Sequence, residues 1–98
     1  MDVQNLKAFL LVAESGSFSA AAEKLHLTQP AVSKRVALLE EQLEAGLFDR
    51  IGRNVSLTEA GSALLPHAKA VERDLQAAEQ SVRDLSGTVT GRLRLATS

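Results

Sequence analysis

Hydroxyl, amide and cationic side chains gather within two predicted helical turns after residue 27. The candidates for contact with a polar ligand are Thr28, Gln29, Pro30, Ser33, Lys34 and Arg35. At about 100° per residue, the helix side opposite Val32 carries Pro30 and Lys34. Gln29 and Ser33 flank that side. Amides and hydroxyls can hydrogen-bond base edges, and an ammonium can contact a phosphate. This face therefore indicates recognition of a DNA major groove.

Each of these side chains also has a plainer alternative role. Gln29 and Ser33 are the candidates for base-edge contacts, because an amide can pair with adenine and a hydroxyl suits several edges. The alternative for Gln29 is a solvated first-turn side chain. Pro30 either meets a thymine methyl or only starts the helix. Lys34 is expected to contact DNA, whereas Arg35 points about 60° from the buried stripe and could instead pair with an acid or touch the DNA backbone.

Arg50 and Arg53 form a second basic site with only Asp49 nearby. On a hairpin they would contact phosphates or the minor groove. The alternative for both is solvated charge. For Arg50, which would emerge from a strand beside Phe48, a further alternative is an internal ion pair.

The elements that must position these residues form a helix-turn-helix. Helices are predicted over about 3–15, from a cap at residue 17 to about 25, and over about 28–44. Capping residues or glycines bound them: Asp2, Gly16, Ser17, Thr28 and, near the end of the third helix, Gly46. The third helix has one apolar stripe, which is expected to be buried: Val32, Val36, Leu39, Leu43 and Leu47.

Two further features extend this core. The helix predicted over about 3–15 has apolar residues around most of its circumference, so an element besides the helix-turn-helix is expected to pack on it. Residues 47–50 and 55–57 flank a glycine- and asparagine-bearing tip at 51–54, which predicts a small β-hairpin, a candidate wing.

A long final helix is predicted from its cap, Thr58, to about residue 85. Its apolar residues step by four or three: Leu64, Ala68, Val71, Leu75, Ala78, Val82 and Leu85. A lone helix has no core to bury such a stripe, so a homodimer through this helix is expected. Acidic side chains beside the stripe disfavour a simple parallel pair, and Pro66 is expected to bend the helix near its start.

The composition fits one small globular domain. Of 98 residues, 45% are hydrophobic and 23% charged, and there is no cysteine. No apolar run approaches the roughly 18 residues of a membrane span, and the N-terminus lacks a secretion signal. We therefore expect a soluble cytoplasmic protein with no membrane partner.

The net charge of −1 is low for a DNA-binding domain, but the charges are segregated. Between Lys24 and Leu39 there are three cations and no acid. Nothing indicates catalysis, because His26 and His67 have no second ligand or nucleophile at a suitable spacing. We expect no enzyme activity, no metal and no cofactor in this segment.

Six motifs, taken in order, resemble the N-terminal domain of bacterial LysR-type transcriptional regulators. They are Leu6-x-x-Phe9, Gly16-Ser17-Phe18-Ser19-x-Ala21-Ala22, Leu27-Thr28-Gln29-Pro30-Ala31-Val32-Ser33, Leu39-Glu40, Leu47-Phe48-x-Arg50 and Leu57-Thr58-x-Ala60-Gly61. The resemblance covers the whole chain, and the ordered set is specific although each motif alone is weak.

The resemblance implies a mainly α winged helix-turn-helix at 1–57, with a three-helix core and a small hairpin wing. A linker and dimerisation helix would follow at 58–86. Residues 87–98 would be a hinge and the first strand of an effector-binding domain, which binds a small molecule in the whole protein.

The function expected from the residues and the resemblance together is sequence-specific transcriptional regulation on the nucleoid. A dimer, or a tetramer of the whole protein, would bind an imperfect inverted repeat in double-stranded DNA, with residues 28–44 in the major groove. Two departures from the family pattern matter. The family's glycine after Leu43 is replaced by Glu44, and Lys34 stands where many relatives carry arginine, which favours phosphate contact over bidentate guanine recognition.

Two alternatives remain open on the sequence alone. The chain could be another dimeric winged-helix regulator, resembling the MarR or molybdate-regulator families. It could also be a helical protein-interaction module that uses its heptads to assemble partners and does not bind DNA.

Overall fold

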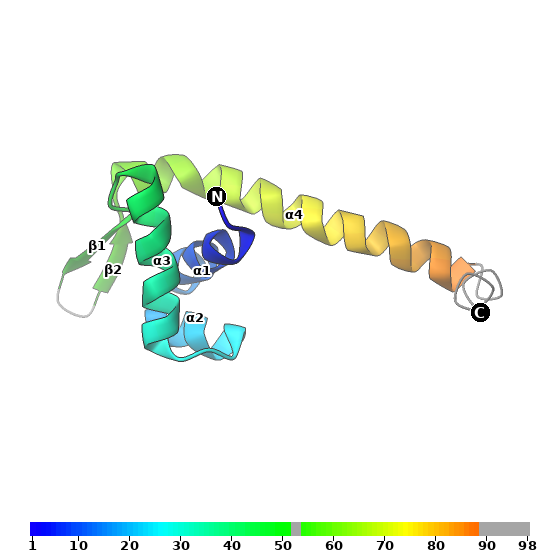
Figure 1. The fold of residues 1–98 in the computed structure, drawn as a ribbon, viewed down its shortest axis with the longest axis horizontal. Coiled ribbons are helices and arrows are strands. Elements are labelled where there is room, and N and C mark those ends of the chain that lie inside the picture. Colours follow the sequence, from blue (N-terminus) through cyan, green and yellow to red (C-terminus); the bar gives the residue numbers. More distant parts are fainter. Residues whose placement is uncertain (52–53, 89–98) are drawn as a thin grey trace.

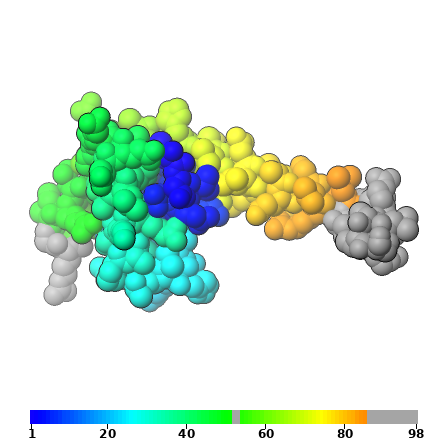
Figure 2. Space-filling model, viewed as in Figure 1, coloured from blue at the N-terminus to red at the C-terminus, as the bar shows by residue number. Residues whose placement is uncertain are grey.

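The computed structural model describes residues 1–51 and 54–88 and is mainly helical (Figure 1). Its elements are α1 (Val3–Ser15), α2 (Phe18–Leu25), α3 (Gln29–Leu43), β1 (Phe48–Ile51), β2 (Asn54–Leu57) and α4 (Glu59–Thr88). The first three helices pack together, the two strands form a hairpin beside them, and α4 leaves this body as a long arm (Figures 1 and 2). The predicted winged helix-turn-helix with a long terminal helix is confirmed.

The predicted caps form where the sequence places them. The Asp2 carboxylate accepts from the amide of Gln4 at 2.7 Å, and the Ser17 hydroxyl accepts from that of Ala20 at 3.1 Å. Thr28 caps α3 in the same way. Each cap satisfies an amide that the first turn of a helix leaves without a partner. The start of α3, and with it the candidate contact face, is therefore fixed by its own sequence.

The residue that ends α3 differs from the prediction. The helix stops at Leu43, within one residue of the predicted end at about 44, but Glu44 rather than Gly46 terminates it, because Glu44 adopts the left-handed conformation (φ 54°, ψ 40°). The amide of Ala45 then donates to the carbonyl of Glu40 at 3.1 Å. Leu43, expected on the buried stripe, is 36% exposed, since the chain turns away from the core immediately after it. Glutamate thus occupies the conformation that a glycine adopts at lower cost.

The core consists of two apolar clusters joined by Phe48. One cluster lies between α1, α2 and the first half of α3, and the other between α1, the end of α3 and α4. Phe48 packs against both, with its ring centroid 5.3 Å from that of Phe9 and 5.8 Å from that of Phe18. The hairpin is thereby attached to the helical body through Phe48, together with Val55 and Leu57 of the second strand, which pack against one cluster each.

The hairpin is antiparallel and pairs Phe48 with Leu57 and Ile51 with Asn54. Ile51 and Asn54, the first and last residues of the predicted four-residue tip, therefore pair in the ladder and do not belong to the tip. Leu47, expected in the first strand, instead precedes it and is buried. Residues 52 and 53 lie outside the part of the chain that the structure describes.

The first half of α4 covers α1, which confirms that α1 needs a second partner. Ala68 is 1% exposed, and Leu64 and Val71 pack against the same cluster. The expectation that the stripe has no core within its own chain is therefore wrong for this half. Toward the other end, Val82 and Leu85 are 64% and 61% exposed on the projecting arm (Figure 2).

Thr58 joins α3, the hairpin and α4 at one junction. Its amide donates to the carbonyl of Leu47 at 3.0 Å, and its hydroxyl donates to that of Gly46 at 2.6 Å. The same hydroxyl accepts from the amide of Gly61 in the first turn of α4. From α3, the Glu40 carboxylate accepts the amide of Leu47 at 2.7 Å. We refer to Glu40, Leu47, Thr58 and Gly61 as the α3–α4 junction.

Candidate nucleic-acid interface

The first turns of α3 sort their side chains as the sequence predicts. Val32 and Val36 are buried in the core between the helices. On the other side, Gln29, Pro30 and Lys34 are exposed, as is Thr28 before them, while Ser33 and Arg35 are half-buried at the edges. A rigid helix start therefore presents an amide, an apolar ring and an ammonium to the surroundings.

The Gln29 side chain is held by α2, which the sequence analysis did not anticipate. The Ser19 hydroxyl donates to the Gln29 side-chain oxygen, Oε1, at 3.1 Å. The two residues are ten positions apart, and the bond spans the turn between α2 and α3. No periodicity within one helix could reveal it, because it depends on how the two helices cross.

Arg50 is exposed, and it makes a contact within the chain that the sequence did not predict. Its guanidinium carbon lies 4.1 Å from the centroid of the Phe18 ring, a cation–π arrangement. Within residues 1–51 and 54–88 it has no acidic partner, so the predicted alternative of an internal ion pair is not observed. The ring positions the guanidinium and leaves its charge uncompensated. Phe18 belongs to one of the six motifs named above, but its contact with Arg50 was not predicted.

These residues line a common groove between α2, the start of α3 and the hairpin. Its walls are Ser17, Phe18, Ser19, Gln29, Arg50, Asn54 and Val55. The fold therefore brings together a candidate for base reading, Gln29, and a candidate for phosphate contact, Arg50, which are 21 positions apart in the sequence. Arg53, the other arginine predicted for the wing, falls outside the described residues.

The electrostatics of this face favour an anionic partner. Lys34 and Arg50 are exposed, and neither forms an ion pair with a described residue. Acidic residues of α3 lie in its second half, where Glu40 is engaged in the α3–α4 junction. A polyanion that approached the start of α3 would thus meet Lys34 and Arg50, whose charges no described acidic side chain neutralises.

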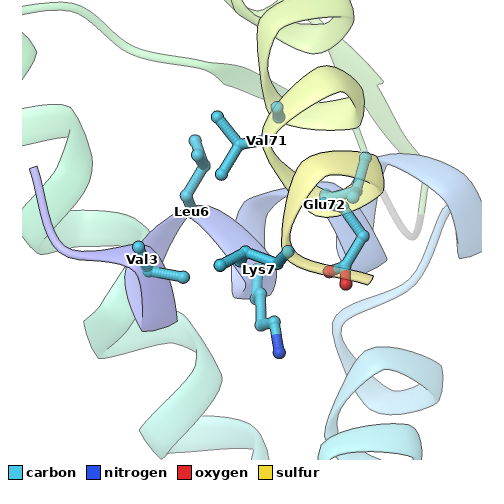
Figure 3. A pocket seen from close by; sticks show the side chains of 8 residues that line it. Val3, Leu6, Lys7, Val71 and Glu72 are labelled. Atoms are coloured by element: carbon cyan, nitrogen blue, oxygen red, sulfur yellow. The ribbon is translucent and has the colours of Figure 1, made fainter. Parts of the chain in front are cut away.

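The residues predicted for dimerisation fall into two groups. Leu64, Ala68 and Val71 pack inside the chain. Leu75 is half-buried, and Ala78 and those after it are exposed. The change occurs at a small groove between α1 and α4, where the apolar Val3, Leu6 and Val71 lie on one side and the charged side chains of Lys7 and Glu72 lie on the other (Figure 3).

Two features are absent from the part of the chain that the structure describes. No group of three His, Cys, Asp or Glu side chains in this part of the chain could hold a metal ion. Nor does any of the four helices, as far as the structure describes them, have the length and apolar character needed to cross a membrane.

Known proteins resemble this chain over much or all of its length. The profile of the "Bacterial regulatory helix-turn-helix protein, lysR family" matches residues 3–62. Over its full length the chain is 59% identical to an uncharacterized HTH-type transcriptional regulator from the ibpB-leuC intergenic region of Azotobacter vinelandii, of which it covers 68%. It is 40% identical, over 98% of its length, to the RuBisCO operon transcriptional regulator of Allochromatium vinosum. The chain spans 32% of that relative.

Solved structures share the fold. The chain superposes on the crystal structure of the CbnR DBD–DNA complex with a TM-score of 0.77 and 34% identity, covering 88% of this chain and 99% of that one. For the BenM DBD/catB site 1 DNA complex, the TM-score is 0.81 at 29% identity, over 88% and 97% of the two chains. For DarR of Vibrio fischeri in complex with DNA, it is 0.77 at 34% identity, over 90% and 30%.

Proposed function

The chain belongs to the lysR family of bacterial regulatory helix-turn-helix proteins, and we propose that it recognises specific sequences in double-stranded DNA with the first turns of α3. The observation that carries the proposal is the exposed face of Gln29, Pro30 and Lys34, held on a capped helix whose opposite face is buried. A helix of this kind fits the major groove, where amides and hydroxyls distinguish base pairs.

In this proposal, Gln29 and Ser33 read base edges, and Thr28, Pro30 and Lys34 contact bases or backbone around them. Arg35 and Arg50 contact phosphates, and Arg53 does so at the wing. The DNA complexes formed by structural relatives of this chain support the partner. The uncompensated charge of Arg50 beside Gln29 supports the side from which the duplex approaches.

We further propose that the working unit is a symmetric dimer on an imperfect inverted repeat. The exposed second half of the α4 stripe supports this, because apolar side chains on a projecting helix are stabilised by a second copy. Residues 1–57 would bind DNA, 58–86 would pair the subunits and 87–98 would lead into a further domain. In the whole protein, that domain would bind a small-molecule effector and support tetramers, in the cytoplasm on the nucleoid.

Titration of labelled DNA at two salt concentrations tests the proposal. We expect saturable binding that weakens steeply with salt, because phosphate contacts release counterions. Lys34→Ala should weaken binding to all sequences and lower the salt slope by about 1. Gln29→Ala should instead reduce discrimination between sequences in a protein-binding microarray.

Two outcomes would contradict the proposal. If the chain showed no saturable, salt-sensitive binding to DNA, the helix-turn-helix would serve as a scaffold for a protein-interaction module. If Gln29→Ala left the microarray profile unchanged, its role in reading bases would be wrong.

A further inference from the structure

We propose that Ser19 is a positioning residue for DNA recognition, which sets the base preference of Gln29 by fixing the orientation of its side-chain amide. The inference rests on the proposed function, because it concerns how Gln29 presents itself to a base. The observation that carries it is the hydrogen bond from the Ser19 hydroxyl to Gln29 Oε1, at 3.1 Å.

The two ends of this bond differ in rigidity. Ser19 lies in the first turn of α2, between the Ser17 cap and the buried Ala21, and follows Phe18, which is itself buried. Its backbone is therefore held on both sides. Gln29 begins α3 and is exposed, and its long side chain has several rotatable bonds. The hydroxyl acts as the fixed partner and the amide as the group that it orients.

The orientation decides which atoms the amide offers. A carboxamide has an accepting oxygen and a donating nitrogen, and a half-turn about its last bond exchanges them. With Oε1 drawn toward α2 by the serine, Nε2 faces away from Ser19. The donor side of Gln29 is then the side presented to a duplex.

A donor prefers base edges that accept. In the major groove these are N7 of a purine, O6 of guanine and O4 of thymine, whereas N4 of cytosine donates and is disfavoured. A Gln29 free of Ser19 would sample both orientations and would discriminate less between these two kinds of edge. Ser19 thus acts on specificity while Gln29 makes the contact.

The place of Ser19 in the groove offers a competing role. Ser19 lies with Arg50 on the same surface, so its hydroxyl could donate to a phosphate. A phosphate contact would strengthen binding to every sequence, because the backbone carries no sequence information. If Ser19 positions Gln29, loss of the hydroxyl should change the base preference. If Ser19 contacts a phosphate, the loss should lower the affinity for all sequences.

Selection of binding sites from a random duplex library separates them, using the 98-residue chain and its variants Ser19→Ala, Ser19→Thr and Gln29→Ala. At the base position that loses its preference in Gln29→Ala, we expect Ser19→Ala to lower the preference for an acceptor edge by about three- to tenfold, the factor of one neutral hydrogen bond. Ser19→Thr, which keeps the hydroxyl, should restore it. Ser19→Ala added to Gln29→Ala should change the preference no further.

The measurement also distinguishes failure of this inference from failure of the proposed function. If Gln29→Ala alters the selected sequence but Ser19→Ala does not, Ser19 does not position the amide. The same holds if Ser19→Ala weakens all sequences equally and flattens the salt dependence. If no variant alters the selected sequence, base reading by Gln29 itself is wrong. Matching thermal denaturation curves for wild type and Ser19→Ala would exclude a general loss of folding.

Discussion

At the scale of single residues, three backbone positions show what the fold demands. Gly16 and Glu44 both adopt positive φ, at 72° and 54°, and each ends a helix. Gly61 has a different reason to be glycine, because α4 starts against the backbone of Leu47. A Cβ on residue 61 would collide with the Leu47 carbonyl oxygen and would come within 2.8 Å of the Leu57 side chain.

Gly61→Ala should therefore destabilise the fold strongly. Because one of the clashing atoms belongs to the backbone, we expect a loss of about 2–3 kcal/mol in the free energy of unfolding. Gly46→Ala is the matched control, since its Cβ would meet nothing closer than a Glu40 oxygen at 3.9 Å. Urea denaturation of both variants measures the difference. Equal stabilities would mean that α4 does not approach the hairpin this closely.

Glu44→Gly should stabilise the fold. Glycine adopts the left-handed conformation without the penalty of a Cβ, although it loses more backbone entropy on folding. The net gain expected is about 0.5–1 kcal/mol. Gly16→Ala, whose Cβ would meet no atom within 4 Å, should show the opposite sign for the same conformational reason. Thermal denaturation can check the pair, and a destabilised Glu44→Gly variant would contradict the assigned cap.

The candidate contact residues of α3 were predictable, whereas the residues that orient them were not. The positions of Gln29 and Lys34 on the exposed face follow from helical periodicity and the Thr28 cap alone. The partners Ser19 and Phe18 come from α2, so their contacts depend on how the helices cross. A pattern along one helix contains no information about that crossing.

At the scale of elements, the α3–α4 junction connects the proposed reading helix to the long arm. The Glu40 carboxylate receives the amide of Leu47, whose carbonyl in turn receives the amide of Thr58. Helix starts could be predicted because local caps define them. The residue that ends α3 could not, because a glutamate at residue 44 terminates the helix where the sequence rules expect glycine.

Glu40→Ala should weaken this junction. It leaves the amide of Leu47, a buried residue, without its acceptor, which costs about 1–3 kcal/mol in the free energy of unfolding. Glu41→Ala removes a neighbouring exposed carboxylate and should change stability by less than about 0.5 kcal/mol. Hydrogen exchange at the amide of Leu47 should accelerate in the first variant and not in the second. Unchanged protection at Leu47 in Glu40→Ala would show that the carboxylate is not its acceptor.

At the scale of the whole molecule, α4 has two roles along one apolar stripe. Its first half completes the core against α1, and its second half extends beyond the body with Val82 and Leu85 exposed (Figures 1 and 2). The regular heptad spacing predicted the stripe but not this division. The stripe leaves the core at the point where α4 passes beyond α1. That point depends on how the two helices pack, which the spacing of residues along α4 does not reveal.

Val82→Asp should convert dimers to monomers without unfolding the chain. The side chain is 64% exposed in the single chain, so a charge there remains solvated in the monomer and disturbs a contact with a second copy. Ala77→Asp adds the same charge farther round the helix, away from the stripe, and should leave the dimer intact. Sedimentation equilibrium reports the mass of each variant. Dimers that persist in Val82→Asp would move the interface elsewhere.

The proposed function depends on the exposed start of α3 reading bases in the major groove. A crystal structure of the chain bound to a duplex obtained by sequence selection tests it most directly. We expect Gln29 and Ser33 within hydrogen-bonding distance of base edges, in two major grooves on one face of the duplex. A complex in which another protein surface covers this face, or in which the duplex is held by a different part of the chain, would contradict it.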